Sequence, residues 1–184
     1  MQQFVPGTNL KYEGGRGMFY LLRPMIQAAD GLTLGQVCSI TGLAPATIQN
    51  WVKRGFVSRP IQKKYRERQL ARILLISSLR DCMKIDSIGE LLALVNGNAN
   101  DTGDDIISEE GMYDYLCEVI SKTEGALSPE EVRSVVEEVI SGYKPPRENA
   151  ERRLGDALCV MTLAYIAGKY KQEADKRFAA MKEE

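Results

Sequence analysis

Residues 33–94 read TLGQVCSITGLAPATIQNWVKRGFVSRPIQKKYRERQLARILLISSLRDCMKIDSIGELLAL and contain most of the structural information in this chain. The pattern predicts two short helices around a tight turn, then a basic wing and two further helices. Thr33 can cap the first helix with its hydroxyl, and Gly42 can end it. Apolar or small residues at three-to-four spacing are predicted to form the buried face of this helix, namely Leu34, Val37, Cys38 and Thr41.

The second helix is predicted to begin at Pro45, because a proline in the first turn removes an N–H that has no helical partner. Ile48, with Trp51 or Val52, gives this helix an inner face. The side chains left outside are Thr47, Gln49, Asn50, Lys53 and Arg54. Amides can read base edges and cations can bind phosphates, so this outer face has the chemistry of a helix that enters the major groove of DNA.

A basic segment, FVSRPIQKKYRERQL, follows Gly55, and Pro60 limits its helical content. Its cations are Arg59, Lys63, Lys64, Arg66 and Arg68. Residues 48–84 contain ten Lys or Arg against Glu67 and Asp81, a local net charge of +8. A field of this sign attracts the phosphate backbone, so we interpret the segment as a basic wing that lies on DNA.

This stretch resembles the DNA-binding region of MerR-type winged-helix regulators and, more closely, the domain of unknown function 1836 family. The resemblance rests on the blocks TIQNWVKRGFV, KKYRERQLARILLI and IDSIGELL, with Pro60 between the first two. It implies that residues 45–54 form the recognition helix and that Lys63, Lys64 and Tyr65 occupy wing positions near phosphates. The residues predicted to bind DNA are therefore Thr47, Gln49, Asn50, Lys53, Arg54, Arg59, Lys63, Lys64, Tyr65 and Arg66.

The chain is expected to be mainly α, with a MerR-like winged helix-turn-helix domain followed by an all-helical domain. We expect a flexible arm at 1–17, the winged domain at 18–96, a polar linker at 97–107 and a helical dimerisation or effector domain at 108–184. The 184 residues are 44% hydrophobic, enough for one substantial core or two small ones. No apolar run reaches about 18 residues and no signal-peptide pattern is present, so we expect a cytoplasmic protein with no membrane contact.

Charge is divided along the chain although its total is only −1. Residues 85–146 carry fourteen Asp or Glu against Lys122, Arg133 and Lys144, a local charge of −11. An acidic region is repelled by phosphates and would lie away from DNA. The alternative is that these acids simply solvate the surfaces of helices.

The C-terminal region after Pro146 has no proline and is predicted to form one helix of about 35 residues, with an apolar middle at 158–166. This middle must be buried in its own domain or against a second subunit, and a homodimer would double the contacts to DNA. An effector pocket could be lined by Met112, Tyr113, Tyr115, Met161, Tyr165 and Tyr170. The same residues at helical spacing also fit an ordinary core.

Enzymatic activity is not expected, because the chain has no histidine and no glycine-rich phosphate loop. The neighbouring acids Asp104/Asp105, Glu109/Glu110 and Glu137/Glu138 are interpreted as solvated surface. Four dispersed cysteines, Cys38, Cys82, Cys117 and Cys159, are interpreted as small core residues in preference to redox sensors, and no metal or cofactor is expected.

The sequence therefore predicts a sequence-specific DNA-binding transcriptional regulator that acts as a homodimer on double-stranded DNA. Two alternatives stay open at this point. One is a protein-interaction module that keeps the winged fold without reading DNA, and the other is a regulator gated by a small-molecule effector in the C-terminal helices.

Overall fold

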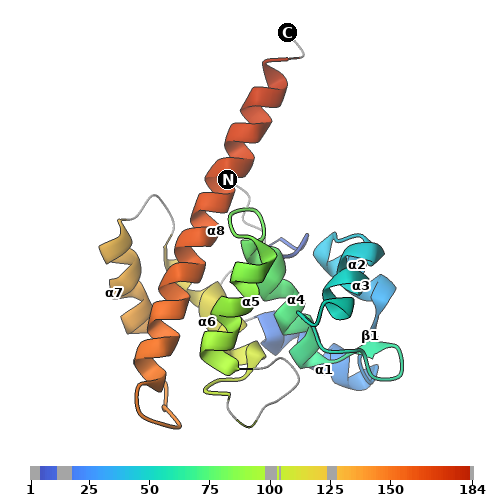
Figure 1. Cartoon of the computed structure of the whole chain (residues 1–184), viewed down its shortest axis with the longest axis horizontal. Coiled ribbons are helices and arrows are strands. Elements are labelled where there is room, and N and C mark those ends of the chain that lie inside the picture. The colour runs from blue at the N-terminus through green and yellow to red at the C-terminus, as the bar shows by residue number, and fades with distance from the viewer. Residues whose placement is uncertain (1–4, 12–17, 98–102, 104, 124–127, 183–184) are drawn as a thin grey trace.

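The computed structural model describes residues 5–11, 18–97, 103, 105–123 and 128–182. This part of the chain is mainly helical, as predicted, with one two-stranded sheet (Figure 1). The elements are α1 (Met18–Ala28), β1 (Leu32–Thr33), α2 (Leu34–Thr41), α3 (Pro45–Lys53), β2 (Lys64–Tyr65), α4 (Glu67–Leu79), α5 (Ile85–Asn96), α6 (Glu109–Lys122), α7 (Pro129–Ile140) and α8 (Ala150–Ala180).

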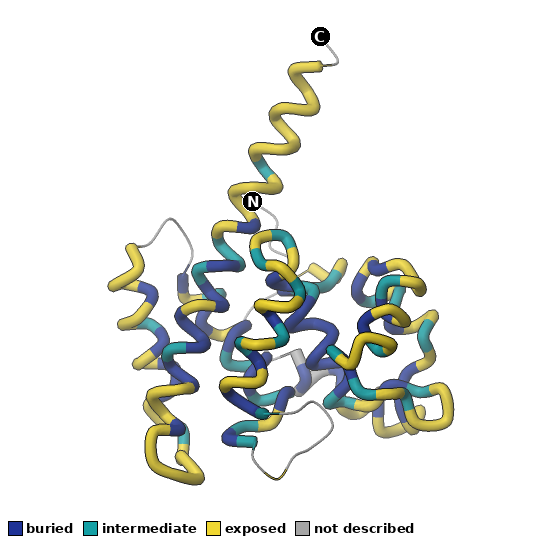
Figure 2. The backbone as a smooth tube through the Cα atoms, viewed as in Figure 1, coloured by how far each residue is buried: buried dark blue, intermediate teal, exposed yellow. Residues whose placement is uncertain are grey.

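Helix α4 lies at the centre of the fold. Leu70, Ile73, Leu74 and Leu79 have no exposed surface, and the helix packs against α1, α2, α5, α6 and α8. Figure 2 shows the buried segments meeting along this helix. A helix that is apolar on most of its surface must be covered on several sides. The N-terminal and C-terminal helices therefore pack around the same element.

The structure differs from the expected pair of separate domains. One hydrophobic cluster extends from Val5 to Ala164 and includes residues from both sides of the expected linker. Residues 98–102 and 104 lie outside the described part of the chain, but Ile106 is buried and Asp105 forms an ion pair with Arg68 at 3.4 Å. Polar composition alone could not show that the end of the expected linker docks on α4.

The N-terminal segment also differs from the expectation of a flexible arm at 1–17. Of this range the structure describes residues 5–11, in which Val5 is buried and the Asn9 amide donates to the Ile40 carbonyl at 2.9 Å. The Tyr113 hydroxyl donates to the Pro6 carbonyl at 2.6 Å. Gly7 has φ 72, and a Cβ here would lie 2.5 Å from the Leu74 carbonyl oxygen. This segment is therefore packed against α2, α4 and α6.

Helix α8 is the longest described element, with 31 residues. Its first half packs against α5, α6 and α7, and the predicted apolar middle is covered within the same chain by these contacts. Beyond Gly168 the helix extends away from the rest of the molecule, and it is exposed along almost its whole surface (Figure 2).

Candidate nucleic-acid interface

Helix α2 is capped as the sequence predicts. The Thr33 hydroxyl accepts from the Gln36 amide at 3.3 Å, and the Gln36 side chain accepts from the Thr33 amide at 2.8 Å, which forms a capping box. Gly42 ends the helix with φ 70, in the left-handed region that favours glycine. The chain then turns within three residues and enters α3 at Pro45. These local contacts fix the direction in which α3 leaves α2.

Helix α3 has the two faces that the sequence predicts. Ile48 and Trp51 are buried against the core, at 0% and 5% exposure. Gln49, Asn50 and Lys53 are exposed. Thr47 is half-buried, so it lies at the edge of the outer face. The exposed face therefore combines two amide side chains with one cation.

Arg54 follows α3 directly and is held by contacts within the chain. Its guanidinium forms an ion pair with Asp86 of α5 at 2.8 Å and lies 4.7 Å from the centre of the Phe56 ring. Both partners of the ion pair are largely exposed, so water screens this pair. Arg54 was predicted to bind DNA, and a phosphate would have to compete with Asp86 for it.

The wing is a short hairpin. Ile61 and Lys64 exchange two backbone hydrogen bonds of 2.9 Å, and Gln62 and Lys63 between them have φ 49 and 64. Two consecutive positive φ values are typical of a type I′ turn. The hairpin continues into β2, which pairs antiparallel with β1 so that Lys64 lies opposite Thr33. Ile61 and Lys63 are exposed in this hairpin, and Arg59, which precedes it, is exposed as well.

Three predicted contacts at the base of the wing are engaged elsewhere. Tyr65 is only 3% exposed, because β2 turns its ring into the core, and burial raises the pKa of its phenol. Tyr65 was predicted to contact DNA, but in this structure the core covers its ring and leaves almost no surface for such a contact. The Lys64 amine donates to the Ala29 carbonyl, and Arg66 forms an ion pair with Asp30 at 2.6 Å. Both cations are therefore directed toward the loop that connects α1 and β1.

The basic segment at residues 48–84 has fewer free cations than its local net charge of +8 suggests. Four of its ten cations, Arg54, Arg66, Arg68 and Arg72, pair with acids outside the segment, namely Asp86, Asp30, Asp105 and Glu109. Lys53, Arg59 and Lys63 form no ion pair with any residue in the described ranges. Figure 1 places α3 and the β1–β2 sheet at the same end of the molecule, away from α7. The candidate interface is thus the outer face of α3 together with the tip of the wing.

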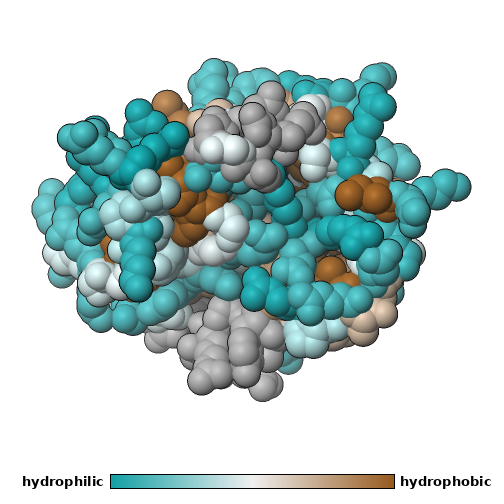
Figure 3. All heavy atoms as spheres, turned by 90° about the horizontal axis from the view of Figure 1, so that it is seen from below, coloured by the Kyte–Doolittle hydropathy of each residue, from teal (hydrophilic) through white to brown (hydrophobic). Residues whose placement is uncertain are grey.

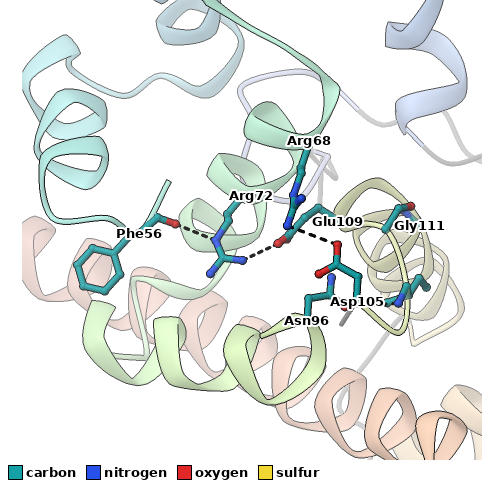
Figure 4. Close-up of polar contacts among 9 residues, drawn as sticks. Phe56, Arg68, Arg72, Asn96, Asp105, Glu109 and Gly111 are labelled. Carbon is teal, nitrogen blue, oxygen red and sulfur yellow. Dashed lines mark hydrogen bonds and ion pairs between the residues drawn. The ribbon is translucent and has the colours of Figure 1, made fainter. Parts of the chain in front are cut away.

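A buried ion pair links the end of α3 to the C-terminal helices (Figure 4). Arg72 of α4 donates from Nε to the Phe56 carbonyl at 2.7 Å and from Nη1 to Glu109 of α6 at 2.5 Å. The side chains of Arg72 and Glu109 are 6% and 0% exposed. Burial raises the pKa of Glu109, whereas the Arg72 charge acts in the opposite direction. The interpretation of Glu109 as solvated surface was wrong, because α6 directs it against α4.

The predicted effector pocket does not form from the six residues proposed for it. Met112, Tyr113 and Met161 are fully buried core residues, whereas Tyr170 is 59% exposed on the far part of α8. A hollow of about 500 Å³ lies elsewhere, where Arg68, Asp105 and Glu109 meet Lys144. The aromatic and methionine residues therefore serve mainly as core, which was the other interpretation of their spacing.

The cysteines do not share one environment. Cys117 and Cys159 are buried, and burial raises the pKa of the Cys117 thiol to about 12. Cys38 is half-buried and Cys82 is exposed, so the interpretation as core residues holds for two of the four. No described helix combines the length and the apolar character needed to cross a lipid bilayer.

Comparison with known proteins finds a family model that is similar to the region that contains this interface. Residues 31–116 match the family model described as Domain of unknown function (DUF1836). The chain is also similar to the uncharacterized protein YkrK of Bacillus subtilis (strain 168), with 28% identity over 110 residues that cover 58% of this chain. The alignment covers 47% of that relative, so the chain spans about half its length. No solved structure matches the chain.

The DUF1836 match begins just before β1 and ends within α6. It therefore crosses the expected linker, and it contains both partners of the Arg54–Asp86 and Arg72–Glu109 pairs. The matched region coincides with the part of the fold in which α3, the wing and α4 are tied to α5 and α6.

Proposed function

We propose that the chain is a cytoplasmic DNA-binding transcriptional regulator without enzymatic activity, and that residues 18–96 act as a MerR-like winged helix-turn-helix domain. The observation that carries this proposal is the outer face of α3. It exposes Gln49, Asn50 and Lys53 at the same end of the molecule as the wing cations Arg59 and Lys63. Amides on an exposed helix next to unpaired cations are the combination that duplex DNA requires.

Each part of this surface has a separate role in the proposal. Gln49 and Asn50 read base edges, because a carboxamide can form two hydrogen bonds with adenine in the major groove. Lys53, Arg59 and Lys63 bind phosphates and set the orientation of α3 on the duplex. Arg54 contributes through its contacts with Asp86 and Phe56, which hold the end of the helix.

The proposed regulator binds as a homodimer. One recognition helix with two base-reading residues covers few base pairs, whereas two copies can read half-sites separated by about one helical turn, roughly 34 Å. Dimerisation also doubles the number of phosphate contacts, and hence the slope of binding affinity against salt concentration.

The proposal is tested by selecting bound sequences from a random duplex pool and measuring affinity for the enriched sequence by fluorescence anisotropy. Gln49→Ala and Asn50→Ala should each weaken the free energy of binding to the selected sequence by about 1–3 kcal/mol. Each should also relax the sequence preference at one base pair. Lys63→Ala should weaken binding to all sequences and lower the salt slope by about 1 per contact. Lys176→Ala, on the exposed part of α8, is the matched control and should leave binding unchanged.

Two results contradict the proposal. One is the absence of duplex binding near 50 mM salt, a concentration at which even non-specific binders are retained. The other is wild-type affinity after Lys53, Arg59 and Lys63 are all replaced by alanine.

The ion pairs around the wing favour a second candidate function. Four arginines of the basic segment are paired with acids from the rest of the chain, which suits a module that contacts protein more than one that binds a polyanion. On the face shown in Figure 3, the described hydrophobic residues form small patches within a hydrophilic surface, so they do not make up a broad apolar docking site. Failure of the DNA experiments together with capture of a basic peptide by the acidic region at residues 85–146 would favour this candidate.

A further inference from the structure

The last part of α8 and the two residues after it, residues 169–182, extend beyond the rest of the molecule (Figures 1 and 2). All of these residues are exposed except Glu173, which is half-buried. They include three of the most exposed large hydrophobic side chains, Tyr170 and Phe178 at 59% and Met181 at 73%. An isolated helix of this length is only marginally stable in water, so both the helix and its apolar side chains point to a partner.

Five apolar residues of α8 and its C-cap, beginning just before this segment, form a stripe with a symmetrical spacing. Ala167, Tyr170, Ala174, Phe178 and Met181 are separated by three, four, four and three residues. At 3.6 residues per turn they fall within about 80° of the helix circumference. The order of spacings is the same in both directions from Ala174. A stripe of this kind matches its own copy when the second helix runs antiparallel.

In such a pair, Ala174 faces Ala174 of the second copy, Tyr170 faces Phe178, and Ala167 faces Met181. Small residues meet at the centre, where the helix axes can approach closely, and a small residue meets a large one at each end. A two-fold interface requires that whenever one residue contacts another, the reverse contact is also made. The palindromic spacing satisfies this requirement without any additional surface.

The charges beside the stripe fit the same arrangement. Glu173 and Arg177 lie on one side, and Lys171 and Asp175 lie on the other. Within the single chain these residues already form ion pairs of 2.8 and 2.7 Å along the helix. In the antiparallel pair, Glu173 also comes beside Arg177 of the second copy, and Lys171 comes beside Asp175. Opposite charges therefore meet on both sides of the apolar stripe.

The body of the protein leaves this stripe accessible. Gln172 donates a hydrogen bond to Asp81, and Gly168 packs against Asp81 and Cys82. At helical spacing Gly168 and Gln172 lie about 140° around the helix from the centre of the stripe. The packed side of α8 and the apolar stripe are thus on largely opposite faces.

We propose that residues 167–181 form a self-association surface on which a second copy of this chain packs antiparallel, with the two-fold axis at Ala174. This inference deepens the proposed function. The use of the dimer in DNA recognition rests on that proposed function, whereas self-association is tested by itself. The contact is small and mostly helical, so a dissociation constant on the order of micromolar is expected.

Sedimentation equilibrium of the full chain from about 1 to 200 µM tests the surface. The wild-type protein should dimerise, and Phe178→Glu should weaken association at least a hundredfold. Lys176→Glu introduces a glutamate on the same helix about 160° from the stripe and should leave association unchanged. Circular dichroism confirms that both variants keep their helices. A wild-type monomer at 200 µM, or an unchanged dimer in Phe178→Glu, overturns the inference.

Charge exchange tests the antiparallel register. Arg177→Glu places two glutamates beside each other across the interface and should weaken the dimer about tenfold. The double variant Glu173→Arg/Arg177→Glu should restore it, whereas failure of both effects refutes this register. Duplex binding is measured separately, because a chain that dimerises through the stripe without binding DNA supports this inference and refutes the proposed function.

Discussion

Removal of Glu109 should strongly destabilise the protein, because it leaves the Arg72 guanidinium buried without its charge partner. The two side chains are 0% and 6% exposed and are joined at 2.5 Å. Loss of one partner from a buried ion pair typically costs about 3–5 kcal/mol. Arg72 would keep its hydrogen bond to the Phe56 carbonyl, so Glu109→Ala is expected near the lower end of this range. A loss of about 3 kcal/mol lowers the melting temperature of a chain of this size by roughly 6–12 °C.

Urea denaturation followed by circular dichroism at 222 nm measures this loss. Glu118→Ala is the matched control, because Glu118 is also on α6 and pairs with Lys122 at an exposed position. Its ion pair should contribute less than about 1 kcal/mol. The double variant Arg72→Met/Glu109→Leu should be less destabilised than Glu109→Ala, since an apolar pair leaves no buried charge. A cost below about 1 kcal/mol for Glu109→Ala would refute the assignment of a buried, mutually dependent pair.

Three further outcomes follow from single positions. Gly42→Ala should lower the free energy of unfolding by about 1–2 kcal/mol, because φ is 70 and the new Cβ would lie 2.4 Å from the Asn9 side chain. Gly35 lies in open space, so Gly35→Ala should stabilise α2 by up to about 1 kcal/mol in the same urea titration. Ser128→Ala should cost about 1 kcal/mol, seen as an earlier urea midpoint, because it removes the cap of α7. Burial raises the folded-state pKa of Glu109 above its ordinary 4.5. The free energy of unfolding should therefore fall as pH rises from 4.5 through the folded-state pKa. Glu109→Gln should remove this pH dependence in urea titrations across about pH 4–8.

Each of these outcomes has a clear opposite. Equal effects of alanine at Gly42 and Gly35 would show that the left-handed turn after α2 is not required. An unchanged urea midpoint in Ser128→Ala would place the start of α7 elsewhere. Identical pH profiles for the wild-type protein and Glu109→Gln would mean that Glu109 titrates as it does in the unfolded chain.

The features that sequence predicted well are local. Thr33 caps α2, Gly42 ends it and Pro45 begins α3, so both elements carry their own boundary signals. The two faces of α3 also follow from helical periodicity alone. Such features need no knowledge of what packs on the helix.

The features that sequence missed depend on partners far along the chain. Arg54 pairs with a residue 32 positions away, and Arg72 with one 37 positions away. Before folding, Glu109 cannot be distinguished from its neighbour Glu110, and only the approach of α4 buries one of them. The family resemblance implied a wing position near phosphates for Tyr65, but the pairing of β2 with β1 decides which side the ring faces. The presence of Arg72 within an apolar helix run was the one available signal of a buried partner.

The acidic region at residues 85–146 has a role that its net charge did not reveal. Two of its acids hold the segment that ends α3: Asp86 of α5 binds Arg54, and Glu109 of α6 binds Arg72, which in turn donates to the Phe56 carbonyl. The orientation of α3 relative to the wing therefore depends on where α5 and α6 lie. Any displacement of these helices must either move the end of α3 or break a buried ion pair, and the second costs several kcal/mol. The cheaper response is for α3 to move with them, so the acidic helices are mechanically part of the candidate interface.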